Sequence, residues 1–244
     1  LCGVSKANSS VDYAMLEYCI REDLKLKRPR MMAVLDPIKL VIDNYPEGQV
    51  EYLEAPNNME NEELGTRKIP FSGELYIERD DFMAEPPKKY KRLYPGNEVR
   101  LMNAYFVTCT GYEADDDGTI RVVHCTYDPE TKGGNAPDGR KVKGTIHWVE
   151  ASNAGKVEVR LYENIVDEEK GVYNKEDGSL NVNPNSLTVT SAYVEPELLK
   201  AKGYDSYQFV RNGFFCADIH DSREGAPVFN RIVSLKSSFK LPKA

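Results

Sequence analysis

Basic and aromatic residues alternate within one short stretch, residues 88–103, of an otherwise acidic chain. Its cations and tyrosines are Lys88, Lys89, Tyr90, Lys91, Arg92, Tyr94 and Arg100. Cations beside flat aromatic rings suit phosphates and unstacked bases, which is how proteins hold single-stranded RNA. The same pattern also suits a solvated basic loop between two strands, and the stretch alone does not decide between the two readings.

A second basic segment, residues 139–149, alternates with the period of a β-strand. One face is apolar and carries Trp148, which we expect to anchor a core. The other face carries Lys141, Lys143 and His147, which we expect to point outward. The alternative is an edge strand that its lysines keep from pairing with other chains.

Recognised catalytic and metal-binding motifs are absent from the sequence. It has no glycine-rich phosphate loop and no nucleophile-elbow motif. His124 and Cys125 could ligate a metal with Cys109, but their spacing matches no known site. The acidic loops match no calcium-binding loop. We therefore expect neither a catalytic residue nor a metal, while an enzyme with an unrecognised site stays as an alternative.

The composition predicts a folded chain in a reducing compartment. Of its 244 residues 41% are hydrophobic, enough for a real core, and the net charge of -7 counts against nonspecific nucleic-acid binding. Five scattered cysteines without a Cys-x-x-Cys pattern favour free thiols and a cytoplasmic location. No apolar run approaches the ~20 residues that span a membrane.

The elements that position these residues are mostly strands. An amphipathic helix is expected over residues 10–24, with a capping box from Ser9 to Asp12, and Pro29 prevents its continuation. From Met31 the hydrophobic period changes to two, and one strand is expected over residues 98–108. Asn212-Gly213 predicts a two-residue hairpin turn. Short strands with frequent turns indicate antiparallel β-structure, as barrels or sandwiches.

Several segments then resemble the glutaminyl-tRNA synthetase family in its anticodon-binding part. They are residues 19–24, 29–44, 69–82, 139–149, 207–216 and 227–231, in the family's order along the chain. The most specific is residues 139–149, Gly-Arg-Lys-Val-Lys-Gly-Thr-Ile-His-Trp-Val. The resemblance covers essentially the whole chain.

The resemblance implies a mainly β fold with two nested antiparallel β-barrels of the anticodon-binding type, preceded by a short helical segment. Residues 1–30 would end a helical connecting subdomain. Residues 31–87 and 187–244 would form the proximal barrel, and residues 88–186 the inserted distal barrel.

The resemblance also implies which residues hold the anticodon bases and nearby phosphates. The implied readers are Arg30, Lys89, Lys91, Arg92, Arg100, Gln208 and Arg211, with Tyr90, Tyr94, Lys141 and Lys143 as possible additional contacts. Two positions depart from the family pattern. Met102 stands where an arginine is common, and Lys89 where bacterial sequences often have glutamine.

The family's nucleotide-binding fold is expected to precede Leu1, so we interpret the chain as a fragment without catalytic activity or cofactor. The full-length ligase would attach glutamine to glutamine tRNA with ATP and magnesium. We expect a cytoplasmic monomer that binds neither DNA nor membranes. The alternatives are the anticodon-binding part of an archaeal or eukaryotic type of glutamyl-tRNA synthetase, and a protein-interaction barrel without RNA.

Overall fold

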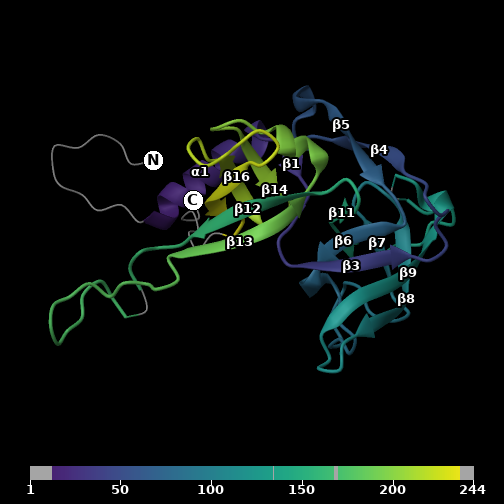
Figure 1. The fold of residues 1–244 in the computed structure, drawn as a ribbon, viewed down its shortest axis with the longest axis horizontal. Coiled ribbons are helices and arrows are strands. Elements are labelled where there is room, and N and C mark those ends of the chain that lie inside the picture. Colours follow the sequence, from purple (N-terminus) through teal and green to yellow (C-terminus); the bar gives the residue numbers. More distant parts are fainter. Residues whose placement is uncertain (1–12, 134, 168–169, 237–244) are drawn as a thin grey trace, which may run out of the picture.

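The computed structural model describes residues 13–133, 135–167 and 170–236 (Figure 1). Its one long helix, α1 (Tyr13–Lys27), packs Leu24 against Phe214 and Val233. Arg21 of the same helix is buried and donates from Nε to the Ser234 carbonyl at 2.7 Å. The helix ends three residues later than predicted, and the predicted capping box lies outside the described residues.

The first sheet has seven strands and is nearly closed. Its order is β1 (Arg30–Met31), β14 (Ser206–Phe209), β15 (Gly213–Ala217), β16 (Val228–Ser234), β12 (Gly155–Tyr162), β13 (Leu187–Val194) and β2 (Ala33–Val34). Because β1 and β2 follow each other in the chain, the two edges of the sheet come together. Phe209, Phe215 and Phe229 fill its interior, with two rings stacked and one edge-on.

The second sheet closes in the same way. Its order is β10 (Thr145–Ile146), β7 (Glu98–Leu101), β8 (Phe106–Ala114), β9 (Ile120–Asp128), β3 (Pro37–Ile42), β6 (Glu74–Glu78) and β11 (Trp148–Glu150). A separate hairpin pairs β4 (Glu51–Pro56) with β5 (Thr66–Phe71). Trp148 is buried here against Phe71, as predicted for a core anchor. The mainly β fold with two barrel-like sheets after a helix is confirmed.

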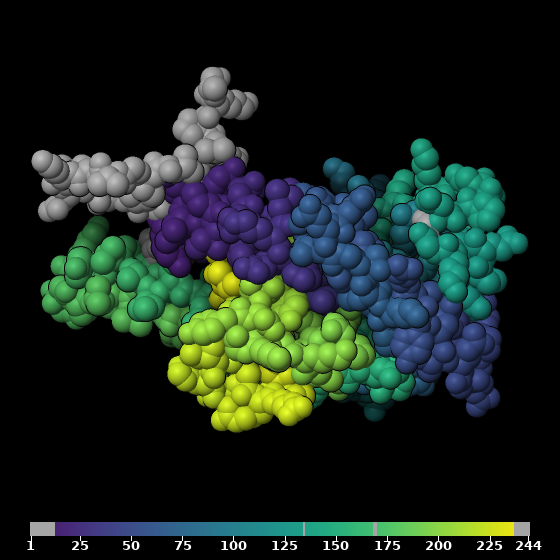
Figure 2. Space-filling model, turned by 90° about the horizontal axis from the view of Figure 1, so that it is seen from above, coloured from purple at the N-terminus to yellow at the C-terminus, as the bar shows by residue number. Residues whose placement is uncertain are grey.

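Short 3-10 turns complete the structure. They are η1 (Glu62–Leu64), η2 (Arg79–Asp81), η3 (Pro129–Thr131) and η4 (Pro196–Lys200). The connection between β12 and β13 projects from the first sheet, on the side away from the second sheet (Figures 1 and 2). Tyr76 of β6 stacks on Tyr193 of β13 at 4.1 Å between ring centroids, so the two sheets are in direct contact.

Sheet membership differs from the expected boundaries. The strands of the second sheet lie within residues 37–150, and those of the first sheet lie within residues 30–34 and 155–234. β3 and β6 pair with each other and with strands of the second sheet, while β12 pairs with β13 and β16 of the first. Alternation of apolar residues marks a strand and its buried face, but it does not name the strand's partners.

The single strand expected over residues 98–108 is two strands. β7 and β8 pair antiparallel, with Glu98 opposite Thr108 and Arg100 opposite Phe106. The chain reverses at Asn103, whose φ is 58°, a conformation that asparagine adopts more readily than most residues. The reversal places Met102 at a pocket that Gln208 of the first sheet also lines, instead of further along one strand.

Candidate nucleic-acid interface

The two basic segments found in the sequence meet in one cleft, which we call the lysine cleft. It has a volume of about 530 Å³ and is lined by Lys88, Lys89, Tyr90, Lys91, Tyr94, Asn97, Glu98, Lys141, Val142, Lys143 and Gly144. A side chain at Gly144 would place its Cβ 1.9 Å from the Lys91 carbonyl oxygen. Glycine therefore permits the close approach that brings Lys141 and Lys143 beside the first basic segment.

The lysines of this cleft are free cations. Within the part of the chain that the structure describes, the side chains of Lys88, Lys89, Lys91, Lys141 and Lys143 make no ion pair or hydrogen bond. All five are exposed. Free ammonium groups of this kind can neutralise phosphates without first leaving a carboxylate.

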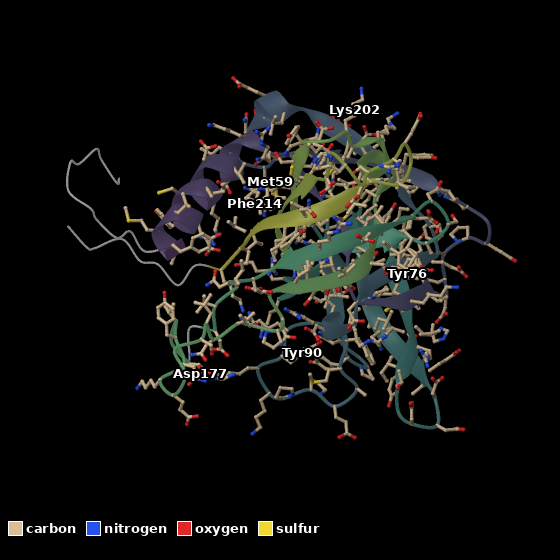
Figure 3. The ribbon with its side chains drawn as sticks, turned by 60° about the vertical axis from the view of Figure 1, so that its left-hand side comes forward. Met59, Tyr76, Tyr90, Asp177, Lys202 and Phe214 are labelled. Carbon is tan, nitrogen blue, oxygen red and sulfur yellow. The ribbon has the colours of Figure 1, made fainter. Side chains whose placement is uncertain are left out.

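The tyrosines of the cleft differ in how they are held. The Tyr90 hydroxyl donates to the Asp80 carbonyl at 2.9 Å. Burial, and then the nearby charge of Asp81, raises the pKa of Tyr90 to about 12, so this hydroxyl stays protonated at neutral pH. Tyr94 lies 6.5 Å from Tyr90 between ring centroids and tilted against it. Figure 3 places Tyr90 on a loop far from Met59.

A second feature, the inter-sheet pocket, lies between the first sheet, the β4–β5 hairpin and the β7–β8 turn. Its volume is about 260 Å³, and its lining residues are Arg30, Met32, Pro56, Met59, Arg67, Met102, Asn103, Gln208, Val210, Arg211 and Leu235. Three predicted readers meet here. Arg30 and Gln208 are register partners in the parallel β1–β14 pair, and Arg211 follows in the β14–β15 turn.

Arg30 and Gln208 both offer unused donors to this pocket. Arg30 Nη2 donates to Glu60 Oε1 at 2.7 Å, while its Nη1 makes no hydrogen bond within the described residues. Hydrogen bonds from Arg30, and then from Lys25, hold the pKa of Glu60 below its usual value. The Gln208 side chain makes no hydrogen bond within the described residues.

Arg211 is held firmly at the tip of its hairpin. Its φ is 67°, and its guanidinium donates twice to Asp81, from Nη1 to Oδ2 at 2.6 Å and from Nη2 to Oδ1 at 2.8 Å. Burial opposes the charged form, but the hydrogen bonds and charge of Asp81 outweigh it, so the pKa of Arg211 is raised. Such a bidentate pair fixes the plane of the guanidinium.

The hairpin turn that carries Arg211 is not the one predicted. Phe209 pairs with Gly213, so the turn is formed by residues 210–212 instead of by Asn212 and Gly213. Gly213 belongs to β15, and a Cβ there would lie 2.6 Å from the Val233 carbonyl oxygen. Glycine is needed at position 213 because β15 and β16 approach each other closely there. The residue of this turn that takes the left-handed backbone conformation is Arg211.

The remaining predicted arginines lie outside both features. Arg92 Nη1 donates to the Asp80 carbonyl at 2.9 Å, and its Nε lies 3.3 Å from Asp81 Oδ1. Arg100 stands over the Phe106 ring at 5.1 Å, and its Nε is buried without a partner among the described residues. The predicted readers therefore lie in the lysine cleft, at the inter-sheet pocket and, for Arg92 and Arg100, outside both.

His147 was predicted on the outward cationic face, and this was wrong. The residue is 0% exposed, and its Nε2 lies 3.0 Å from the Ala33 carbonyl. The alternation breaks between β10 and β11, where His147 links the two sheets. Sequence reasoning also missed Met59, Arg67 and Asp81. Only the acidic pair at residues 80–81, preceding a basic stretch, could have suggested carboxylate partners for the arginines.

The described residues contain no group of three or more His, Cys, Asp or Glu side chains that could hold a metal ion. No described helix has both the length and the apolar composition needed to cross a membrane.

Phosphates need cations that no carboxylate already holds, and unstacked bases need donors at the rim of a pocket. The chain offers the two at different places on adjoining barrel-like sheets, an arrangement that suits single-stranded RNA. Comparison with known proteins then gives the family. Residues 29–128 and residues 145–218 both match tRNA synthetases class I (E and Q), anti-codon binding domain. The chain belongs to this family.

Similar full-length proteins agree with that family. The chain is 52% identical over 242 residues to a glutamine–tRNA ligase of Clostridium kluyveri, covering 99% of this chain and 44% of that protein. It is 54% identical over 243 residues to the glutamine–tRNA ligase of Clostridium perfringens, covering 98% and 43%. The Pseudomonas putida glutamine–tRNA ligase is 50% identical over 242 residues. The chain thus spans less than half the length of these relatives, and it corresponds to their anticodon-binding part.

Proposed function

We propose that this chain binds the anticodon loop of glutamine tRNA, as the anticodon-binding part of a glutamine–tRNA ligase. The observation that supports the proposal is the separation, within the described residues, between lysines without partners in one cleft and unused arginine and glutamine donors at a pocket. An anticodon loop presents phosphates and splayed bases side by side, so it needs both features at once. The relatives' names favour glutamine over glutamate as the amino acid.

The inter-sheet pocket would take one unstacked base. Arg30, Gln208 and Arg211 would contact the edge of that base, while Met59 and Met102 would face its apolar surface. A matched polar contact of this kind discriminates by ~1–3 kcal/mol against a wrong base. Arg92 and Arg100 would serve other bases or the phosphates beside them.

The lysine cleft would hold the RNA backbone. Lys89, Lys91, Lys141 and Lys143 would neutralise phosphates, and Tyr94 would offer a ring for stacking. Lys89 here supplies a charge where a glutamine is common, and Met102 supplies a thioether where an arginine is common. Base contact in this chain would therefore depend more on Arg30, Gln208 and Arg211.

In the longer protein, the part outside this chain would use ATP and magnesium to activate glutamine and transfer it to the tRNA. We further propose a cytoplasmic monomer. The cysteines that the structure describes, Cys19, Cys109, Cys125 and Cys216, are all free thiols, which suits a reducing compartment.

Competition between two halves of the tRNA tests where the chain binds. An isolated anticodon stem-loop and an acceptor-stem minihelix would each be titrated against a complex of this chain with labelled glutamine tRNA. The proposal predicts that the stem-loop displaces the tRNA and the minihelix does not. Equal displacement by both would contradict the proposal.

A further inference from the structure

A single buried carboxylate joins two of the predicted readers. Asp81 ends η2 and is 0% exposed. Its Oδ1 accepts from Arg211 Nη2 at 2.8 Å and lies 3.3 Å from Arg92 Nε, while its Oδ2 accepts from Arg211 Nη1 at 2.6 Å. Arg211 belongs to the hairpin of the first sheet, and Arg92 to the basic stretch before β7 of the second sheet.

The backbone holds Asp81 in place. Its carbonyl accepts from the Leu93 amide at 2.9 Å, and the Met83 amide donates to the Leu93 carbonyl at 3.0 Å. Leu93 and Phe82 are both buried in the core of the second sheet. The neighbouring Asp80 carbonyl accepts from both Arg92 and Tyr90. The backbone of this turn is therefore held in place, and its carboxylate and carbonyl groups orient the two arginines.

Both arginines keep donors for RNA while they contact Asp81. The Arg211 side chain is 29% exposed and lines the inter-sheet pocket, and its Nε is not used by Asp81. The Arg92 side chain is 40% exposed, and its Nη2 is not used by Asp80 or Asp81. A guanidinium fixed by one carboxylate presents its other N–H groups in a known direction, which reduces the ordering cost of binding.

The shared carboxylate also links the two arginines energetically. A buried charge is costly to leave without partners, so removing one arginine makes Asp81 depend more on the other. Residues within one hydrogen-bonded network commonly show non-additive effects. His147 also belongs to this network, because its Nδ1 lies 3.4 Å from Arg211 Nη1.

We propose that Asp81 is the positioning residue that orients Arg92 and Arg211 together and thereby couples recognition of two anticodon bases. The proposal rests on the proposed function, because it assumes that these arginines read RNA. Asp81 itself does not contact the RNA. It acts through the two guanidinium groups, one from each sheet.

The test is a set of binding titrations with glutamine tRNA and its single-base anticodon variants. Arg92→Ala and Arg211→Ala first identify the base that each arginine reads. Asp81→Asn, which keeps the shape and removes the charge, should then reduce discrimination at both of those bases by about tenfold, within the range of one lost polar contact. The two arginine substitutions should be non-additive in the native chain and additive in the Asp81→Asn background.

The matched control is Glu150→Gln. Glu150 is a similarly buried carboxylate, but its partners are Ser72, Ser152 and Asn153 instead of arginines. This control should lower the melting temperature and leave base discrimination unchanged. Asp81→Glu is the second variant in case Asp81→Asn does not fold. It keeps the charge but displaces it by one methylene, so it should also reduce discrimination at both bases.

Three results would overturn the proposal in a native chain that does discriminate between anticodons. One is a uniform loss of affinity for every anticodon variant, in step with the loss of stability that Glu150→Gln shows. Another is lost discrimination at only one base. The third is unchanged discrimination in a folded Asp81 variant while the native chain discriminates, which leaves the proposed function standing. If the native chain shows no dependence on the anticodon, the proposed function fails and this coupling fails with it.

Discussion

The basic side chains at this interface differ in whether a carboxylate holds them. The lysines of the lysine cleft have no carboxylate partner among the described residues, whereas Arg30, Arg92 and Arg211 each contact one. Free lysines suit phosphates, which need charge and little geometry. Held arginines suit base edges, which need fixed donor directions. In the proposed interface, the lysines would therefore contribute mainly to the affinity for RNA, and the arginines mainly to the specificity for its bases.

Substitution of Gln208 tests base recognition with little effect on folding. Its side chain makes no hydrogen bond within the described residues, so Gln208→Ala should leave the free energy of unfolding nearly unchanged. We expect it to weaken binding of native glutamine tRNA by ~1–3 kcal/mol, the usual range for one base contact. Fluorescence titration measures this, with the exposed Gln49→Ala as control. An equal loss for tRNA that already carries a changed base at every anticodon position would contradict base reading by Gln208.

Glu78 gives the pH dependence of stability. Its carboxylate accepts from the amides of Leu35 and Asp36 at 3.0 and 2.9 Å. Burial opposes the charged form, but hydrogen bonds from His147 and from these amides outweigh it, and the pKa of Glu78 is lowered to about 2. Because the folded-state pKa lies below the ordinary value, its stabilisation is complete above pH ~5 and is lost as the pH falls toward ~2.

Urea unfolding between pH 2 and pH 7 measures this contribution. Glu78→Gln should lower the free energy of unfolding at pH 7 by roughly 2–3 kcal/mol and should flatten its decline in acid. The exposed Glu85→Gln serves as control and should leave the curve as it is in the native chain. A Glu78→Gln curve parallel to the native one would show that this carboxylate does not control the acid limb.

At the scale of elements, alternation and turn residues predicted most strands but few of their contacts. The helix, the β14–β15 hairpin and the strand with Trp148 follow from local patterns. The turn residues of that hairpin do not, because Gly213 is required by the Val233 carbonyl of a third strand. The meeting of the two basic segments likewise depends on Gly144 and Lys91, which lie far apart in the sequence.

Gly144→Ala tests that meeting. The added Cβ would lie 1.9 Å from the Lys91 carbonyl oxygen, so the two segments must move apart. We expect a loss of about 1–3 kcal/mol in the free energy of unfolding and weaker tRNA binding. Gly111→Ala is the control, since its Cβ would meet no atom within 4 Å. Unchanged stability and unchanged binding would contradict the close approach as described.

At the scale of the whole molecule, an acidic chain carries a local basic surface. The net charge is -7, yet one cleft gathers five lysines that have no ion-pair partner within the described part of the chain. The two basic segments were visible in the sequence, and the family resemblance predicted that the ligand is a tRNA. The sequence could not predict which strands share a sheet, because pairing between distant strands depends on the packing of the whole chain. It also missed Asp81, whose importance appears only when Arg92 and Arg211 are seen to converge on it.

The salt dependence of tRNA binding tests whether the lysines of the lysine cleft contact phosphates. Replacing Lys141 and Lys143 together by alanine should weaken tRNA binding for every anticodon and should reduce the slope of log affinity against log salt by up to ~1.4, about 0.7 for each phosphate contact. The control is the pair Lys200→Ala and Lys202→Ala, at and just after the end of η4, and Figure 3 shows Lys202 far from Tyr90. An equal change of slope in both double variants would mean that the charge acts through the whole molecule and not through the cleft.

The most direct measurement is the affinity of this chain for glutamine tRNA compared with the same tRNA changed at each anticodon base in turn, at low and at moderate salt. We expect each base change to weaken binding at both salt concentrations, whereas changes in the acceptor stem should have no effect. Equal affinity for all anticodons at low salt would contradict the claim that this pair of β-barrels reads the anticodon.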